Sequence, residues 1–133
     1  MPKQIVFDSF ALMSFFQDEK GADSVCEMIL DSVEGKIELS ICAINLGEVW
    51  YIIARKTSTE QADTLVNEIQ NMPIEIVDAD WMLTRQAAEY KQKGNISYAD
   101  CFAAALAKVR NAEVVTGDKE FKKLEGEIKI SWL

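Results

Sequence analysis

Two kinds of apolar stretch alternate along the chain. Short apolar runs are typical of buried strands, and they predict strands at 4–7, 37–41, 74–77, 113–116 and 128–132. Longer stretches with apolar residues every three or four positions are typical of helices with one buried face. They predict helices at 10–16, 22–33, 43–56, between Ser58 and Pro73, from a cap at Asp78 or Asp80 to about Lys93, and at 97–109, with one helical turn at 118–123.

Because strands and helices alternate, the pattern predicts an α/β fold, with a parallel sheet covered by helices on both faces. The 133 residues contain no internal repeat, linker or low-complexity segment. We therefore expect one domain over residues 1–133. In the helix at 22–33 the expected buried face consists of Ala22, Val25, Cys26, Ile29, Leu30 and Val33.

Composition narrows the possible chemistry. The chain has no histidine, which excludes mechanisms that use a histidine base, and its net charge is −8, which disfavours coating nucleic acid by charge alone. Cys26, Cys42 and Cys101 are far apart in apolar surroundings and are expected to be buried free thiols. With no apolar run long enough for a membrane and no signal peptide, a cytoplasmic protein is expected.

Three carboxylates stand alone in apolar surroundings. Asp8, Glu48 and Asp100 are each the only charged residue in a stretch of 14 residues or more. A buried carboxylate is costly unless something pairs with it. Helix capping is the simpler explanation for any one of them, and Ser97-x-x-Asp100 fits a capping box. All three together are harder to explain in this way.

A fourth acid, Asp118, follows the expected strand at 113–116, and its simpler role is also a helix cap. Asp8 and Asp118 both follow carboxyl ends of strands, where open parallel sheets form their sites. Glu48 lies in the helix after the second expected strand, and Asp100 lies in the first turn of the helix before the fourth, so all four acids can converge on one edge of the sheet. Four carboxylates in one pocket need either protons or a cation. An all-oxygen ligand set favours Mg²⁺ or Mn²⁺, ions that also bind phosphate esters.

Four short motifs resemble the PIN-domain family, and most closely the VapC-type toxins of toxin–antitoxin pairs. They are Asp8-Ser9, Asn45-x-x-Glu48-Val49, Ser97-x-Ala99-Asp100 and Thr116-Gly117-Asp118-x-x-Phe121. The resemblance implies a PIN-like, Rossmann-like three-layer sandwich with a central, mainly parallel sheet. It also implies an endoribonuclease that depends on Mg²⁺ or Mn²⁺ and cleaves RNA phosphodiesters.

The resemblance also implies roles for single residues. Asp8, Glu48, Asp100 and Asp118 become the catalytic and metal-binding acids, with Glu48 as a ligand or as acceptor of the attacking water's proton. Ser9, Asn45 and Thr116 would support them. Asn45 would orient Glu48 from the same helix face, and the hydroxyls of Ser9 and Thr116 would contact an aspartate or a water. For Asn45 and Thr116 a plain structural role stays open. Lys119, Lys122 and Lys123 either guide the RNA backbone or form a solvated cluster.

The expected partners are RNA, a cognate antitoxin protein with a basic segment, and a second copy of the chain in a homodimer. Two other classes of protein compete with this interpretation. A phosphoacceptor enzyme or receiver domain would carry a second acid near Asp8, and the neighbouring residues are Ser9 and Phe10. A non-catalytic PIN-like module would bind RNA or protein without cutting, and the presence of all four acids argues against it.

Overall fold

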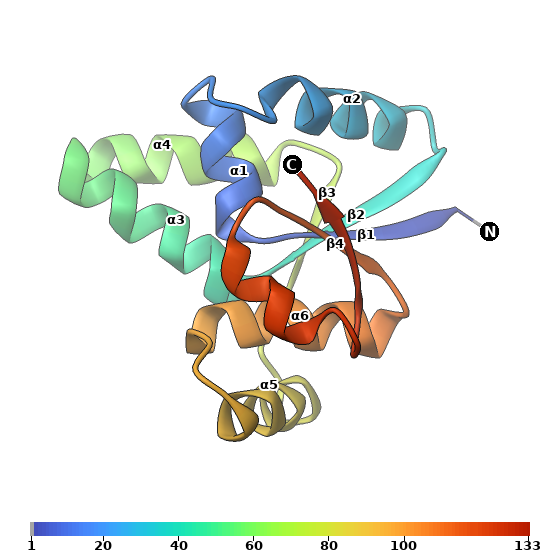
Figure 1. The fold of residues 1–133 in the computed structure, drawn as a ribbon. Coiled ribbons are helices and arrows are strands. Elements are labelled where there is room, and N and C mark those ends of the chain that lie inside the picture. The colour runs from blue at the N-terminus through green and yellow to red at the C-terminus, as the bar shows by residue number, and fades with distance from the viewer. Residues whose placement is uncertain (1) are drawn as a thin grey trace.

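Five short strands form one sheet in the order β3-β2-β1-β4-β5 in the computed structural model, which describes residues 2–133 (Figure 1). All four neighbouring pairs are parallel, so every strand has its carboxyl end at the same edge. The strands are β1 (Lys3–Phe7), β2 (Ile37–Cys42), β3 (Ile74–Val77), β4 (Glu113–Thr116) and β5 (Lys129–Trp132). The prediction of a mainly parallel α/β sheet is confirmed.

Helices cover both faces of this sheet (Figure 1). They are α1 (Ser9–Phe16), α2 (Ala22–Val33), α3 (Ala43–Lys56), α4 (Thr59–Gln70), α5 (Trp81–Lys93) and α6 (Tyr98–Arg110), with a 3₁₀ turn η1 (Lys119–Leu124). Successive strand residues point to opposite faces. Accordingly Val6 and Val114 pack in the core beneath α5 and α6, whereas Phe7 and Val115 pack in the core beneath α1 to α4.

Helix α6 lies flush against the sheet. Every residue from Asp100 to Ala107 is buried, because four small alanine side chains leave room for close approach to the strands. The helix begins where Ser97 Oγ accepts a hydrogen bond from Asp100 N–H (3.2 Å). It ends at Asn111, which adopts the left-handed conformation with φ 51°. This position fixes Asp100 at the carboxyl edge of the sheet.

Helix α2 differs from its prediction. Its contacts are with α1 and β2, through buried Ala22 and Val25, while Met28 and Ile29 are partly buried. Leu30 and Val33, expected in the core, are 58% and 67% exposed. Cys26 is exposed as well, so the expectation of a buried thiol is wrong there, whereas Cys42 and Cys101 are buried as expected and all three are free. The apolar stripe is simply wider than the surface that α2 covers at this margin of the fold.

Within residues 2–133 there is no helix with both the length and the apolar character needed to cross a bilayer.

Candidate active site

Asp8 lies at the carboxyl end of the central strand, with both of its oxygens already bonded. Its Oδ1 accepts a hydrogen bond from Ala11 N–H (2.9 Å), which makes Asp8 the N-cap of α1. Its Oδ2 accepts a short hydrogen bond from the hydroxyl of Thr116, the last residue of β4. Because β1 and β4 are paired, Thr116 lies beside Asp8, although 108 residues separate them in sequence.

Burial dominates the electrostatics of Asp8, which is 1% exposed. Loss of hydration raises the pKa of its carboxyl to about 7, and the charges of Asp118 and Glu48 act in the same direction. The hydrogen bonds from Thr116 and Ala11 oppose this rise because they stabilise the carboxylate. Asp8 is therefore held rigidly in a place where its negative charge is unfavourable unless a cation is near.

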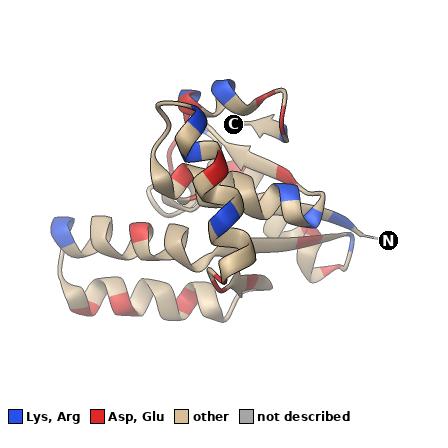
Figure 2. Cartoon of the chain, turned by 90° about the horizontal axis from the view of Figure 1, so that it is seen from below, with Lys and Arg blue, Asp and Glu red and all other residues tan. Residues whose placement is uncertain are grey.

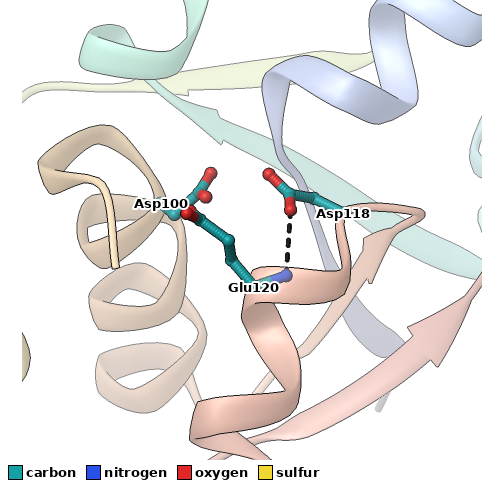
Figure 3. Close-up of side chains that lie close together, drawn as sticks. All are labelled: Asp100, Asp118 and Glu120. Carbon is teal, nitrogen blue, oxygen red and sulfur yellow. Dashed lines mark hydrogen bonds between the residues drawn. The ribbon is translucent and has the colours of Figure 1, made fainter. Parts of the chain in front are cut away.

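Asp100 and Asp118 face each other across the site (Figure 3). Asp100 is in the first turn of α6 and is 5% exposed, whereas Asp118 follows β4 on a loop and is half-buried. The pKa of Asp100 is raised to about 8. Burial is the main cause, and the nearby charge of Asp118 adds to the rise. The Asp118 loop is fixed by its own N–H, which donates to Thr116 Oγ1 (2.9 Å).

The loop approaches α1 so closely that a residue larger than glycine at position 117 would require the ring of Phe10 to move. A methyl group on Gly117 would overlap the ring of Phe10. This contact packs the start of α1 directly against the segment that carries Asp118.

Glu48 lies on α3, and its Oε1 accepts a hydrogen bond from Ser9 Oγ (2.7 Å). Within residues 2–133, Asn45 makes no hydrogen bond to Glu48. The Asn45 side chain is fully buried, and its Nδ2 donates to the Ala99 carbonyl oxygen of α6 (3.0 Å). The structure thus differs from the expectation that Asn45 orients Glu48: Ser9 has that contact, and Asn45 joins α3 to the start of α6. The Asn45 Oδ1 atom is buried without a hydrogen-bond partner.

Glu120 joins the acids although no sequence motif had singled it out. Carboxylate oxygens of Asp100, Asp118 and Glu120 lie within 4.8 Å of one another (Figure 3). Asp118 Oδ1 accepts a hydrogen bond from Glu120 N–H (2.9 Å), which places Glu120 in the first turn of η1. The sequence signal that could have identified Glu120 is its position two residues after Asp118. Asp118 is the N-cap and Glu120 the second residue of the 3₁₀ turn, and side chains at these two positions can lie on the same side.

A groove with a volume of about 600 Å³ reaches this cluster and is lined by Glu48, Asp100, Asp118 and Glu120. All of these donors are carboxylate oxygens, the ligands that Mg²⁺ and Mn²⁺ prefer. Three of the oxygens are close enough to share one ion. Burial, and then the neighbouring carboxylates, raise the pKa values of Asp8 and Asp100, so a cation nearby would favour their ionised forms. The residues therefore fit a divalent cation.

The lysines of η1 are oriented toward solvent. Lys119, Lys122 and Lys123 are exposed, and Lys123 Nζ donates to the carbonyl oxygen of Asn95. This arrangement favours the solvated cluster over a direct role at the acids.

Taken together, the fold and site define a Rossmann-like α/β protein with a cluster of carboxylates at the carboxyl edge of its sheet. The model of the PIN domain matches residues 5–127 of the sequence. The chain therefore belongs to the PIN-domain family, and the resemblance drawn from its motifs is confirmed. Among curated proteins no sequence matches.

Solved structures of VapC toxins have the same fold. VapBC2 from Rickettsia felis, bound to a promoter DNA fragment, matches with a TM-score of 0.75 at 19% identity, over 98% of each chain. DNA-bound VapBC from Salmonella typhimurium matches with a TM-score of 0.74 at 22% identity, over 99% of this chain and 98% of the other. The sarcin–ricin-loop-cleaving toxin VapC20 of Mycobacterium tuberculosis matches with a TM-score of 0.70 at 14% identity, over 93% of this chain and 95% of the other.

Proposed function

We propose that this PIN domain is an endoribonuclease that depends on Mg²⁺ or Mn²⁺ and acts as the toxin of a VapBC-type pair. The observation that carries the proposal is the convergence of acids from distant segments. Asp8, Glu48, Asp100 and Asp118 lie at one edge of the sheet, and Glu120 adds a fifth carboxylate. Such a cluster suits phosphodiester hydrolysis, in which negative charge develops on the phosphate.

In this proposal Asp100, Asp118 and Glu120 would hold the ion, and Asp8 would contribute its negative charge from the floor of the site. When bound, the ion supplies a Lewis acid that offsets the charge on the scissile phosphate. Glu48 lies at the wall of the groove with Ser9 oriented toward it, so it is placed to accept a proton from the attacking water. Thr116 holds Asp8 and the Asp118 loop through one hydroxyl.

The protonation states of Asp8 and Asp100 should make binding of the divalent cation depend on pH. With pKa values of about 7 and 8, Asp8 and Asp100 retain protons near neutral pH when no ion is bound. Binding of a divalent cation favours their ionised forms and therefore releases protons. Cation affinity should rise with pH between about 6 and 8.

A protein partner is part of the proposal. A similar structure, VapBC-5 from Mycobacterium tuberculosis, is named as a member of the VapBC family of toxin–antitoxin systems. The net charge of −8 and the acidic groove suit a cognate antitoxin with a basic segment. The exposed Leu30 and Val33 of α2 are compatible with the expected homodimer. A cytoplasmic location is also part of the proposal.

Cleavage of a panel of labelled single-stranded RNAs, in EDTA, Mg²⁺ and Mn²⁺, tests the activity. The Asp8→Ala and Asp100→Ala variants should lose at least about 100-fold in rate, since each removes charge from the site. Glu27→Gln, at an exposed position on α2, is the matched control and should cut like the wild type. Cutting that survives both alanine substitutions would contradict the proposed site.

Mn²⁺ titration calorimetry gives a second readout. Glu120→Gln should weaken Mn²⁺ binding roughly 10-fold, whereas Glu27→Gln should leave it unchanged. Intact Mn²⁺ binding together with RNA binding but no cutting of any RNA would instead identify the non-catalytic module.

A further inference from the structure

The groove at the acids continues between α1 and α3 for two helical turns. Two rows of side chains at four-residue spacing line it: Ser9, Met13 and Gln17 on the α1 side, and Glu48, Ile52 and Lys56 on the α3 side. A spacing of four places residues on one helix face. We refer to this part of the cavity as the α1–α3 groove.

Side chains of the two rows face each other in three pairs, of which the two end pairs are polar and the middle pair is apolar. At the acid end Ser9 donates to Glu48 (2.7 Å). At the far end, with the Gln17 amide oxygen turned toward α3, that oxygen accepts a hydrogen bond from Lys56 Nζ (3.0 Å). Met13 and Ile52 lie between these polar pairs as an apolar section. The groove therefore offers carboxylates at one end, an apolar wall in the middle and a cation at the other end.

Its length suits a short piece of single-stranded nucleic acid. Glu48 and Lys56 are eight residues apart on one helix, which corresponds to about 12 Å along its axis. That distance covers about three nucleotides at a stacked rise of about 3.4 Å each, and fewer if the strand is extended. Phe10, which is 40% exposed beside the acids, adds an aromatic face on which a base can stack.

The charge at the far end favours a polyanion. Lys56 makes no ion pair with any carboxylate in residues 2–133, and the preceding Arg55 lies over the ring of Tyr51 instead. Figure 2 shows this basic end of α3 as a blue tip where the chain turns into α4. A basic peptide in the groove would meet a like charge at Lys56, whereas a phosphate would find a cation that is bonded to the neutral Gln17 amide and to no carboxylate in residues 2–133.

We propose that the α1–α3 groove binds the nucleotides on one side of the scissile phosphate, with Lys56 contacting a backbone phosphate about two turns of α3 from the acids. The proposal rests on the ribonuclease function. It assigns Lys56 and Gln17 to substrate binding and assigns the apolar section to a base. Chemistry at the acids does not involve Lys56, so its loss should raise KM and leave kcat unchanged.

The test compares Lys56→Gln with Lys129→Gln, an exposed lysine at the amino end of β5 and thus at the opposite edge of the sheet. The probe is a fluorescein-labelled 12-nucleotide RNA that contains the cut site, titrated by anisotropy with Ca²⁺ in place of Mg²⁺. Lys56→Gln should raise Kd roughly 3- to 10-fold and reduce the slope of log K against log salt by about 0.7, the value for one phosphate contact on a single strand. Lys129→Gln should change neither quantity.

Gln17→Lys keeps the proposal testable if the first variant folds poorly. It adds a cation at the same place and should steepen the salt slope by about 0.7. Equal binding by the wild type and both groove variants, with cleavage intact, would overturn the groove assignment alone. An unchanged RNA Kd together with tighter binding of a basic antitoxin by Lys56→Gln would also overturn it and would make the groove a protein-binding surface. Failure of the wild type to cut or bind any RNA would instead reject the underlying function.

Discussion

Asp8 combines a hydrogen-bonded position with an unfavourable charge. Its pKa is about 7 in the folded protein, compared with roughly 4 in an unfolded chain. Between these pH values the folded state binds more protons than the unfolded state, so stability falls as pH rises. Asp100, with a pKa of about 8, extends the fall to higher pH.

Asp8→Asn should therefore weaken the pH dependence of the metal-free protein. Between pH 4 and 7 the slope of the unfolding free energy should decrease by on the order of 1 kcal/mol per pH unit, because one of the two buried acids no longer titrates. Urea unfolding in EDTA at several pH values measures this slope. Asp31→Asn on α2 is the matched control, and an Asp8→Asn slope equal to that of the wild type would show that Asp8 is ionised throughout this range.

The close fit of α6 against the sheet determines the position of Asp100, and Ala104 lies fully buried in this contact. Ala104→Leu would force three additional carbons between helix and strands. We expect a loss of about 1–3 kcal/mol in unfolding free energy, together with weaker Mn²⁺ binding as Asp100 moves. Val109→Leu, at a 43% exposed position of the same helix, should remain within about 0.5 kcal/mol of the wild type. Equal stability of the two variants would contradict the close packing.

Elements were largely predictable from sequence because apolar periodicity reports burial directly. Asp8, Glu48 and Asp100 could be identified as candidate site residues in a similar way, because a lone charge in an apolar stretch needs a structural explanation. Periodicity does not report which neighbour covers a helix, so the exposure of Cys26, Leu30 and Val33 was missed. The partner of Asn45 and the place of Glu120 depend on how α3, α6 and η1 meet, which no local pattern contains.

Over the whole molecule there is an excess of acidic side chains, and several of them cluster at the carboxyl edge of the sheet. The net charge is −8, acidic and basic side chains are interspersed over most elements (Figure 2), and the largest pKa rises among the carboxyl groups are at Asp8 and Asp100. A divalent cation should therefore raise the free energy of unfolding mainly by binding at the acid cluster beside Asp8 and Asp100.

We expect Mg²⁺ to raise the melting temperature at pH 8 more than NaCl of equal ionic strength does. A ligand present at 100 times its Kd stabilises the folded state by about 2.7 kcal/mol, whereas NaCl only screens charge. Differential scanning fluorimetry measures both effects. Asp100→Asn should remove the difference between the salts, and a difference that persists in this variant would place the ion elsewhere.

The pairing of β1 with β4 also has a consequence for synthesis on the ribosome. Asp8 is translated more than 100 residues before Thr116, Asp118 and Glu120. The central strand thus lacks one neighbour, and the acid cluster lacks two members, until translation has passed β4 and η1. A nascent chain or a fragment cut short before β4 cannot assemble the cluster. If the protein is a toxin, its harmful activity begins only after residue 120 has been translated, which leaves time for an antitoxin already present to meet each new molecule.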